Sequence, residues 1–137
     1  QMVSLSKAQN TFFSIEIHGT FSSMQTRAAV KSNPPYKTLA ETAENQSVFT
    51  RKQIEGTLIG YYSPQLFEGA TVGGFHHHFI SDDHKFGGHV LDFHLDKGNV
   101  SYQLFDTFEQ HLPVNDKQYM QHDFSKDDIE KSIHQSQ

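Results

Sequence analysis

The segment Gly73–Phe93 (GGFHHHFISDDHKFGGHVLDF) contains five of the ten histidines in the chain. Its two ends are rich in aromatic and β-branched residues and predict two strands joined by the turn SDDHKFGG. Because successive side chains of a strand point to opposite faces, His76 and His78 share one face and His77 takes the other. If the two strands pair as a hairpin, His89 stands opposite His78 and three imidazoles converge on one side of the sheet.

Three converging imidazoles are a typical donor set for zinc and other first-row metals. Three protein ligands leave coordination positions for water or substrate, which indicates a catalytic site rather than a structural one. Gly87 and Gly88 precede His89 and would allow a bulge or a close backbone approach beside the site. The alternative is a histidine-rich surface without a metal. In both interpretations His77 is expected on the outer face and His84 in a solvated loop.

A second candidate site residue, Arg27, follows from strand alternation. The segment TFFSIEIHGTF predicts a half-buried strand with Phe13, Ile15 and Ile17 on its inner face. Arg27 has the same odd parity if no bulge intervenes, and its planar guanidinium could bind an acidic substrate through a two-pronged contact. The alternative is a surface arginine.

The acidic residues around the histidines are expected to be structural or solvated. Asp82 and Asp83 lie in the turn, where aspartate is favoured for local hydrogen bonds. Glu55 and Glu68 stand next to glycines in expected turns and are interpreted as solvated charges.

The composition restricts the class of protein. A length of 137 residues fits one domain, residues 1–137, with a single core. The net charge of −5 offers no basic face for phosphates and argues against nucleic acid as a partner. No apolar run approaches the roughly 18 residues of a membrane helix, and QMVSLSKAQNTFF lacks the pattern of a signal peptide. The absence of cysteine leaves imidazole and oxygen as metal ligands, and fits a cytoplasmic protein without excluding secretion.

The remaining segments predict a mainly β, β-rich α+β fold. Alternating runs between glycines give six or seven antiparallel strands, with Ser47–Ile54 and Thr57–Tyr62 separated at Gly56. Short helices are expected mid-chain at YKTLAETAENQ and at the C-terminus, where Ser125 and Asp128 resemble a capping box. Alternation also predicts one shared face for His89, Leu91 and Phe93. The expected architecture is an antiparallel sandwich or a small barrel.

Several segments together resemble a known family. GGFHHHFISDDHKFGGHVLDF is similar to the hallmark of the α-acetolactate decarboxylases, a G-[YF]-H-x-H-F segment that runs into G-G-H-V-L-D-F. IEIHGTFSSMQTR resembles the family segment with the site arginine, PPYKTLAETAENQSVF its middle helix, and EGTLIGYYSP its G-T-[LI]-[VI]-G-[FY] strand. The resemblance covers nearly the whole chain from about Phe12 onward.

The resemblance implies a set of site residues. The three zinc ligands of the family correspond to His76, His78 and His89, and its substrate-carboxylate arginine corresponds to Arg27. The resemblance also implies a further N-terminal region that supplies glutamates to the metal site, and a C-terminal glutamate near the position of Gln137. The chain is therefore expected to be the C-terminal, zinc-binding portion of such an enzyme.

The implied activity is zinc-dependent decarboxylation of 2-acetolactate, a small 2-hydroxy-3-oxo acid, to acetoin in the acetoin and butanediol pathway. Zinc would act as a Lewis acid without an organic cofactor, while Arg27 would position the departing carboxylate. A homodimer is compatible with this interpretation. The alternatives are a cupin-like metalloenzyme, which also carries H-x-H on a strand, a non-catalytic metal-binding β-domain, and a fragment that binds zinc without catalysis.

Overall fold

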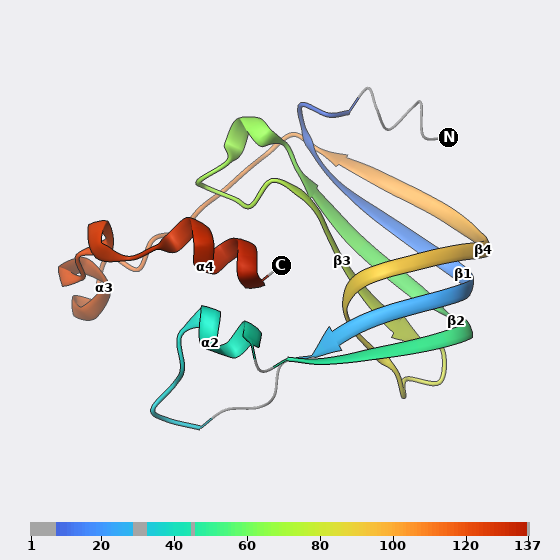
Figure 1. Ribbon diagram of the computed structural model, residues 1–137. Helices are drawn as coiled ribbons and strands as arrows, with labels where there is room; N and C mark the ends of the chain where they lie inside the picture. Colours follow the sequence, from blue (N-terminus) through green and yellow to red (C-terminus); the bar gives the residue numbers. More distant parts are fainter. Residues whose placement is uncertain (1–7, 29–32, 45, 137) are drawn as a thin grey trace.

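The computed structural model of the chain describes residues 8–28, 33–44 and 46–136. Within these residues four antiparallel strands form a closed barrel in which each strand neighbours the next and β4 pairs with β1 (Figure 1). The strands are β1 (Phe12–Ala28), β2 (Ser47–Ser63), β3 (Gly74–Ser81) and β4 (Gly87–Phe105). The predicted mainly β class is confirmed, and of the two predicted architectures the barrel is the one found.

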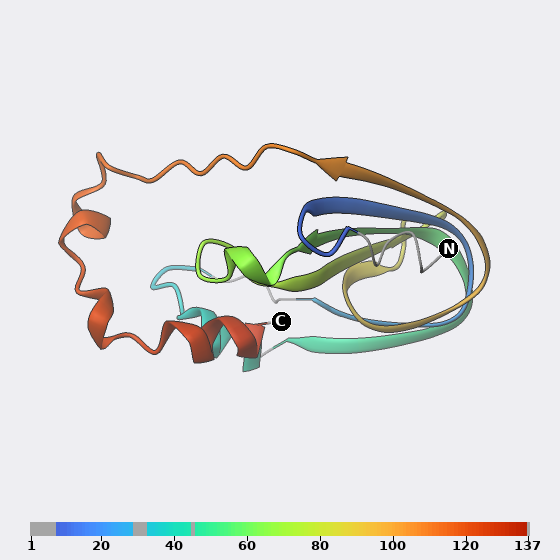
Figure 2. The ribbon, with the colours of Figure 1, turned by 90° about the horizontal axis from the view of Figure 1, so that it is seen from above.

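The predicted number of six or seven strands is wrong, because three of the four strands are long and bend sharply near their middle. Figures 1 and 2 show β1, β2 and β4 turning back together, so that the two halves of each strand lie in different layers. Gly19 lies at this bend and is the register partner of both Gly56 on β2 and Gly98 on β4. The segments predicted as separate strands around Gly56 are therefore the two halves of one strand.

The backbones at this bend approach too closely for side chains. A Cβ atom on Gly19 would lie 2.1 Å from the carbonyl oxygen of Lys97, and one on Gly56 would lie 2.4 Å from that of Ile80. Glycine at these positions allows the sheet to fold over itself without interrupting the hydrogen-bond ladder. We call Gly19, Gly56 and Gly98 the glycine bend.

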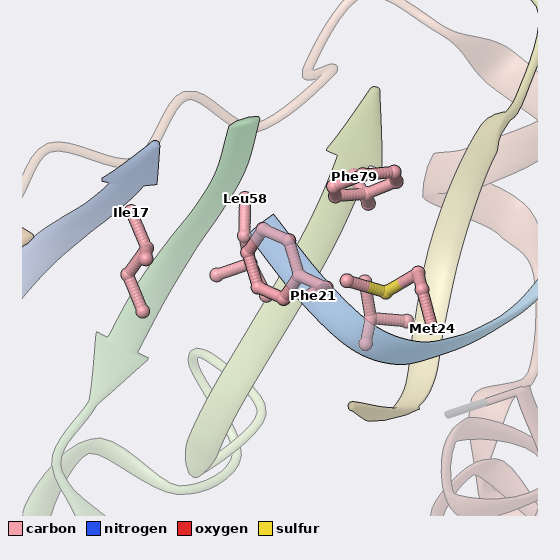
Figure 3. Close-up of a cluster of buried hydrophobic side chains, with 6 residues drawn as sticks. Ile17, Phe21, Met24, Leu58 and Phe79 are labelled. Atoms are coloured by element: carbon pink, nitrogen blue, oxygen red, sulfur yellow. The ribbon is translucent and has the colours of Figure 1, made fainter. Parts of the chain in front are cut away.

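The bent strands enclose one hydrophobic core. Figure 3 shows Phe21 and Met24 of β1 packed with Leu58 of β2 and Phe79 of β3. The ring of Phe21 meets that of Phe79 edge-on at 5.2 Å between centroids. Full burial of side chains this large contributes on the order of 2 kcal/mol each, so this cluster is the main stabilising element of the barrel.

Short helices lie outside the strands, as predicted. They are α2 (Leu39–Glu44), α3 (Lys117–Gln121) and α4 (Ile129–Ser136), with single 3-10 turns η1 (Gln65–Phe67) and η2 (Phe124–Lys126). Helix α4 packs beside α2, which connects β1 to β2 (Figures 1 and 2). None of the helices in the described part of the chain is long and apolar enough to cross a membrane.

The starts of α2 and α4 are capped by side chains. Before α2, the Thr38 hydroxyl accepts a hydrogen bond from the Glu41 amide, and the Glu41 carboxylate accepts one from the Thr38 amide. The Glu41 carboxylate also accepts from the Thr38 hydroxyl, and its two hydrogen bonds from Thr38 lower the pKa of Glu41. Before α4, the Asp128 carboxylate accepts from the Lys131 amide, so Asp128 is the cap. The predicted capping role of Ser125 is wrong, because that residue belongs to η2.

Candidate metal and substrate site

His78 and His89 are direct register partners across β3 and β4, as the hairpin interpretation predicted. Directly opposed residues of paired strands project to the same face, and the centroids of the two rings lie 5.3 Å apart at an interplanar angle of 77°. His89 is in turn the register partner of Arg27 on β1. The barrel thus aligns Arg27, His89 and His78 across three strands, and we call these residues the Arg27–His89–His78 row.

The row lies on the outer face of the barrel. Phe79 and Val90 follow the two histidines in sequence, and both are buried in the core. Alternation therefore turns His78 and His89 away from the interior. His78 is exposed and His89 is half-buried, which leaves both imidazoles accessible from outside.

Arg27 reaches this face because the strand changes parity. Phe21 and Met24 are both buried although they are an odd number of residues apart. The register of β1 against β4 shifts around Ser22, and one additional residue reverses the faces beyond it. The condition that no bulge intervenes is therefore not met, and Arg27 does not share the inner face of Phe13. The half-buried Arg27 lies on the outer face, and the shift places it beside His89.

A second register shift separates His89 from Phe93. It falls between Gln25 and Thr26 of β1 and leaves Leu91 as an additional residue on β4. Phe93 consequently packs against the core, while His89 faces outward. The predicted shared face of His89, Leu91 and Phe93 is wrong, because alternation holds only within an uninterrupted ladder.

His76 lies on the same face as His78, two residues earlier on β3. Its ring is turned toward the preceding loop, where Nε2 donates a hydrogen bond to the carbonyl of Val72 (2.8 Å). Among the described residues, no three histidine, aspartate or glutamate side chains are arranged to hold a metal ion. The structure therefore brings His78 and His89 together, and holds the ring of His76 apart from them.

His77 points to the opposite side from its two neighbours, as alternation predicted. That side is the barrel interior, so the prediction of an outer-face position is wrong. The ring of His77 stacks on Phe75 with 5.3 Å between centroids and meets Phe93 edge-on at 5.9 Å. Burial lowers the pKa of His77, and the neighbouring His76 and His78 lower it further.

The turn between β3 and β4 is held by Asp83, in the structural role predicted for it. Its carboxylate accepts hydrogen bonds from the Ser81 hydroxyl (2.6 Å) and the Lys85 amide (3.0 Å). These bonds, with the Ser81 hydroxyl as the main cause, lower the pKa of Asp83. Asp82 lies 3.2 Å from Nε2 of His18. Glu55 is an exposed residue of β2, and Gln137 lies outside the described residues.

Two features near His76 were not predicted from the sequence. Glu68 was interpreted as a solvated charge, but its carboxylate accepts a hydrogen bond from the Gly73 amide (2.8 Å) and ties down the loop that contains Val72. A cavity of about 570 Å³ opens beside His76, with aromatic walls that include Phe13, Tyr61 and Phe108. A cavity of this size is typical of a small-molecule site, and the sequence gives no spacing that would reveal it.

The comparisons with known proteins agree with the motif around the histidines. The family model described as alpha-acetolactate decarboxylase matches residues 1–126. The chain is 39% identical over 125 residues to the alpha-acetolactate decarboxylase of Lactococcus lactis subsp. cremoris, covering 91% of this chain and 52% of that protein. It is 41% identical over 124 residues to the enzyme of the same name from Streptococcus thermophilus, with 90% and 52% covered. The chain thus spans about half the length of the curated relatives that it matches.

Solved structures share the fold of this chain. A Staphylococcus aureus protein of unknown function, described as similar to alpha-acetolactate decarboxylase, superposes with a TM-score of 0.84 at 35% identity, covering 99% of this chain and 61% of that one. The alpha-acetolactate decarboxylase of Bacillus subtilis strain 168 superposes with a TM-score of 0.87 at 29% identity, covering 98% and 57%. Because the family model matches most of the chain, the chain belongs to the α-acetolactate decarboxylase family.

Proposed function

We propose that this chain takes part in the decarboxylation of 2-acetolactate to acetoin, with zinc held by His76, His78 and His89. Arg27 would bind the substrate carboxylate. The observation that carries the proposal is the Arg27–His89–His78 row, which aligns an arginine with two histidines whose rings are adjacent on one face. The substrate comes from the name of the family to which the chain belongs.

The donor set fits zinc in its chemistry. Two imidazoles are already adjacent, and the third lies on the same face of β3. His76 joins them only if its ring leaves the Val72 carbonyl. A hydrogen bond of this kind contributes about 1 kcal/mol net, whereas zinc binds to three or four protein ligands with on the order of 10 kcal/mol. The loss of one such hydrogen bond is small beside that total, and the proposal requires the His76 ring to rotate away from Val72 when the metal binds.

Zinc bound by these residues would supply a Lewis acid that stabilises negative charge on the substrate oxygens. Arg27 contributes orientation, because its two parallel N–H donors match the two oxygens of a carboxylate. The bond between C2 and the carboxylate carbon breaks, and its electron pair stays with the remaining carbon skeleton. The carboxylate loses its charge as it becomes carbon dioxide, so the contact with Arg27 weakens as the reaction proceeds. Arg27 therefore acts by positioning the substrate before the bond breaks.

A proton must then add to the carbon skeleton to give acetoin. Glu16 is the carboxylate aligned with His78 on the outer face, with Ile59 of β2 between them. Two strand spacings separate the backbones of Glu16 and His78 by roughly 10 Å. This alignment alone does not bring the Glu16 carboxylate to the imidazole pair, and we do not assign it the role of proton donor.

Metal analysis combined with an assay of carbon dioxide release tests this proposal. The protein is expected to bind one zinc per chain and to release carbon dioxide from acetolactate without consuming oxygen, and a chelator should abolish the release. His78→Ala should weaken zinc binding by roughly 100-fold or more, since it removes a metal ligand. His94→Ala is the matched control, because His94 is an exposed histidine of β4 outside the row.

Other results of these measurements would favour one of the alternative functions. Iron with oxygen consumption would indicate a cupin-like metalloenzyme. Zinc binding without carbon dioxide release would indicate a metal-binding domain. Equal effects of His78→Ala and His94→Ala would show that the row is not the metal site.

A further inference from the structure

The imidazole pair lies at the end of a very short ladder. Strands β3 and β4 pair only where residues 78–80 oppose residues 87–89, and we call these pairs the seam. The first half of β3 pairs with β2 alone, while β4 continues along β1 and turns away toward the bend (Figure 1). His78 and His89 form the last pair of the seam on the side where the two strands separate. Backbone hydrogen bonds therefore hold the two strands together on the turn side of this pair, but not on its other side.

Side-chain packing supplies the missing constraint, and His77 is its centre. On the interior side of β3, the ring of His77 stacks on Phe75 at an interplanar angle of 17° and meets Phe93 of β4 edge-on at 80°. Phe93 in turn meets Phe21 of the core edge-on at 6.0 Å. These ring contacts connect β3 to β4 just beyond the point where their hydrogen bonds end.

Gly60 on β2 provides the space that the ring of His77 occupies. The two residues are register partners, and a Cβ atom on Gly60 would lie 2.3 Å from Cδ2 and 2.9 Å from Nε2 of His77. The same atom would lie 2.9 Å from Cγ2 of Ile15. The ring is therefore confined by β2 below it, by Phe75 along its own strand and by Phe93 across the gap.

We propose that His77 is a positioning residue for the metal site: its ring, seated on Gly60 and against Phe93, sets the separation of β3 and β4 and thereby holds His78 beside His89. The inference rests on the proposed function, because it concerns the geometry of two proposed zinc ligands. His77 and His78 are consecutive, so any movement of the backbone at His77 moves His78 as well. Closely packed interiors transmit such shifts instead of absorbing them.

Three variants test the role of the ring. His77→Ala removes it, His77→Leu replaces it with an apolar side chain of similar volume, and Ile54→Ala removes comparable volume from a residue that packs on the same core from β2. Residues that orient metal ligands typically change metal affinity by about 10- to 100-fold when mutated. We expect that loss of zinc affinity, measured by chelator competition, for His77→Ala. His77→Leu should stay within about threefold of the wild type.

Two further measurements separate a positioning role from a general loss of stability. One is the visible spectrum of the cobalt(II) form, and the other is a ring-to-ring contact in the metal-free protein. His77→Ala should change the visible spectrum of bound cobalt and remove the nuclear Overhauser effect between the His78 and His89 rings in the metal-free protein. Ile54→Ala should lower the melting temperature while leaving both unchanged. If His77→Ala does not fold, Phe93→Leu tests the same contact from β4, with the same expected changes.

The possible results separate the two proposals. If the ring contact between His78 and His89 and the cobalt spectrum survive in His77→Ala, or change equally in Ile54→Ala, the positioning role is refuted. If the wild type shows the ring contact but binds neither zinc nor cobalt, the proposed metal site fails. In that case the metal-free measurement still decides whether His77 positions His78.

Discussion

The ladders of β1 and the seam between β3 and β4 belong to one barrel but differ in what determines their geometry. Strand β1 is paired with β2 and with β4 along nearly all of its length, and the glycine bend lies inside both ladders. The seam has three register pairs. Backbone hydrogen bonds therefore determine the shape of the first region, whereas in the second they extend over a short stretch and, in our proposal, side-chain packing adds the missing constraint. Two of the three proposed metal ligands, His78 and His89, lie in the seam, and Arg27 lies beside them on the long β1–β4 ladder.

Adding a methyl group at the glycine bend should give the largest effect on the stability of the ladders. In Gly19→Ala the new Cβ atom would lie 2.1 Å from the Lys97 carbonyl oxygen and 2.5 Å from the Gly98 Cα, and neither backbone atom can move aside. We expect a loss of about 3 kcal/mol or more in the free energy of unfolding, measured in urea.

Ser101→Thr is the control for this prediction, because it also adds one methyl group but does so at an exposed position of β4. It should change the free energy of unfolding by about 0.5 kcal/mol or less. Similar stabilities for the two variants would show that the bend tolerates side chains and that glycine is not required there.

Replacing Arg27 tests what the ladder contributes to the site. Arg27→Lys keeps the charge but loses the planar pair of donors, so zinc should remain bound while kcat/KM for acetolactate falls by about 10- to 100-fold. Arg51→Lys is the matched control, because the Arg51 guanidinium lies over the ring of Phe86 and outside the row. Equal activity of Arg27→Lys and the wild type would assign Arg27 to the surface and limit the site to the histidines.

The smallest expected effect concerns the turn that closes the seam. Because the pKa of Asp83 is lowered in the folded protein, its contribution to stability is complete above the ordinary carboxyl pKa of about 3.9 and is lost as the pH falls through the folded-state pKa. Ser81→Ala removes the main cause and should raise the pKa of Asp83 toward its ordinary value. A carbon-13 titration of the carboxyl groups measures this shift.

Asp123 serves as an internal reference in the same titration. Its pKa is lowered chiefly by a hydrogen bond from the Ser125 hydroxyl, so Ser81→Ala should leave it unchanged. An Asp83 pKa that does not move in Ser81→Ala would show that the Ser81 hydroxyl is not the main cause of the lowered pKa.

Local alternation predicted the parts of the molecule that depend on neighbouring residues. The inner position of Phe13 and Ile17 and the opposite directions of His77 and His78 follow from strand geometry alone, and the structure agrees with them. The pairing of His78 with His89 also followed from the sequence, because the connecting turn is short enough to restrict the register.

Features that depend on distant residues were not predictable in this way. Gly56 has the local character of a turn residue, and only its alignment with Gly19 and Gly98 makes it part of a bend. The additional residues Ser22 and Leu91 reverse the strand faces without any sequence pattern that marks them. Arg27 lies beside His89 because of such a shift. Strand alternation therefore pointed to Arg27 as a site residue, although the uninterrupted alternation that it assumed is not found.

The pairing of β1 with β4 has a consequence for the order in which the barrel can assemble. This ladder joins Phe12, at the start of β1, to Phe105, at the end of β4, whereas β1 and β2 meet across a much shorter connection. Contacts between residues so far apart in sequence form slowly, because closing a long loop costs conformational entropy before any stabilising contact has formed. During synthesis one edge of β1 therefore stays unpaired until β4 has been made. An apolar strand with an open edge is prone to pair with other chains, so newly made copies are most vulnerable to aggregation in this interval.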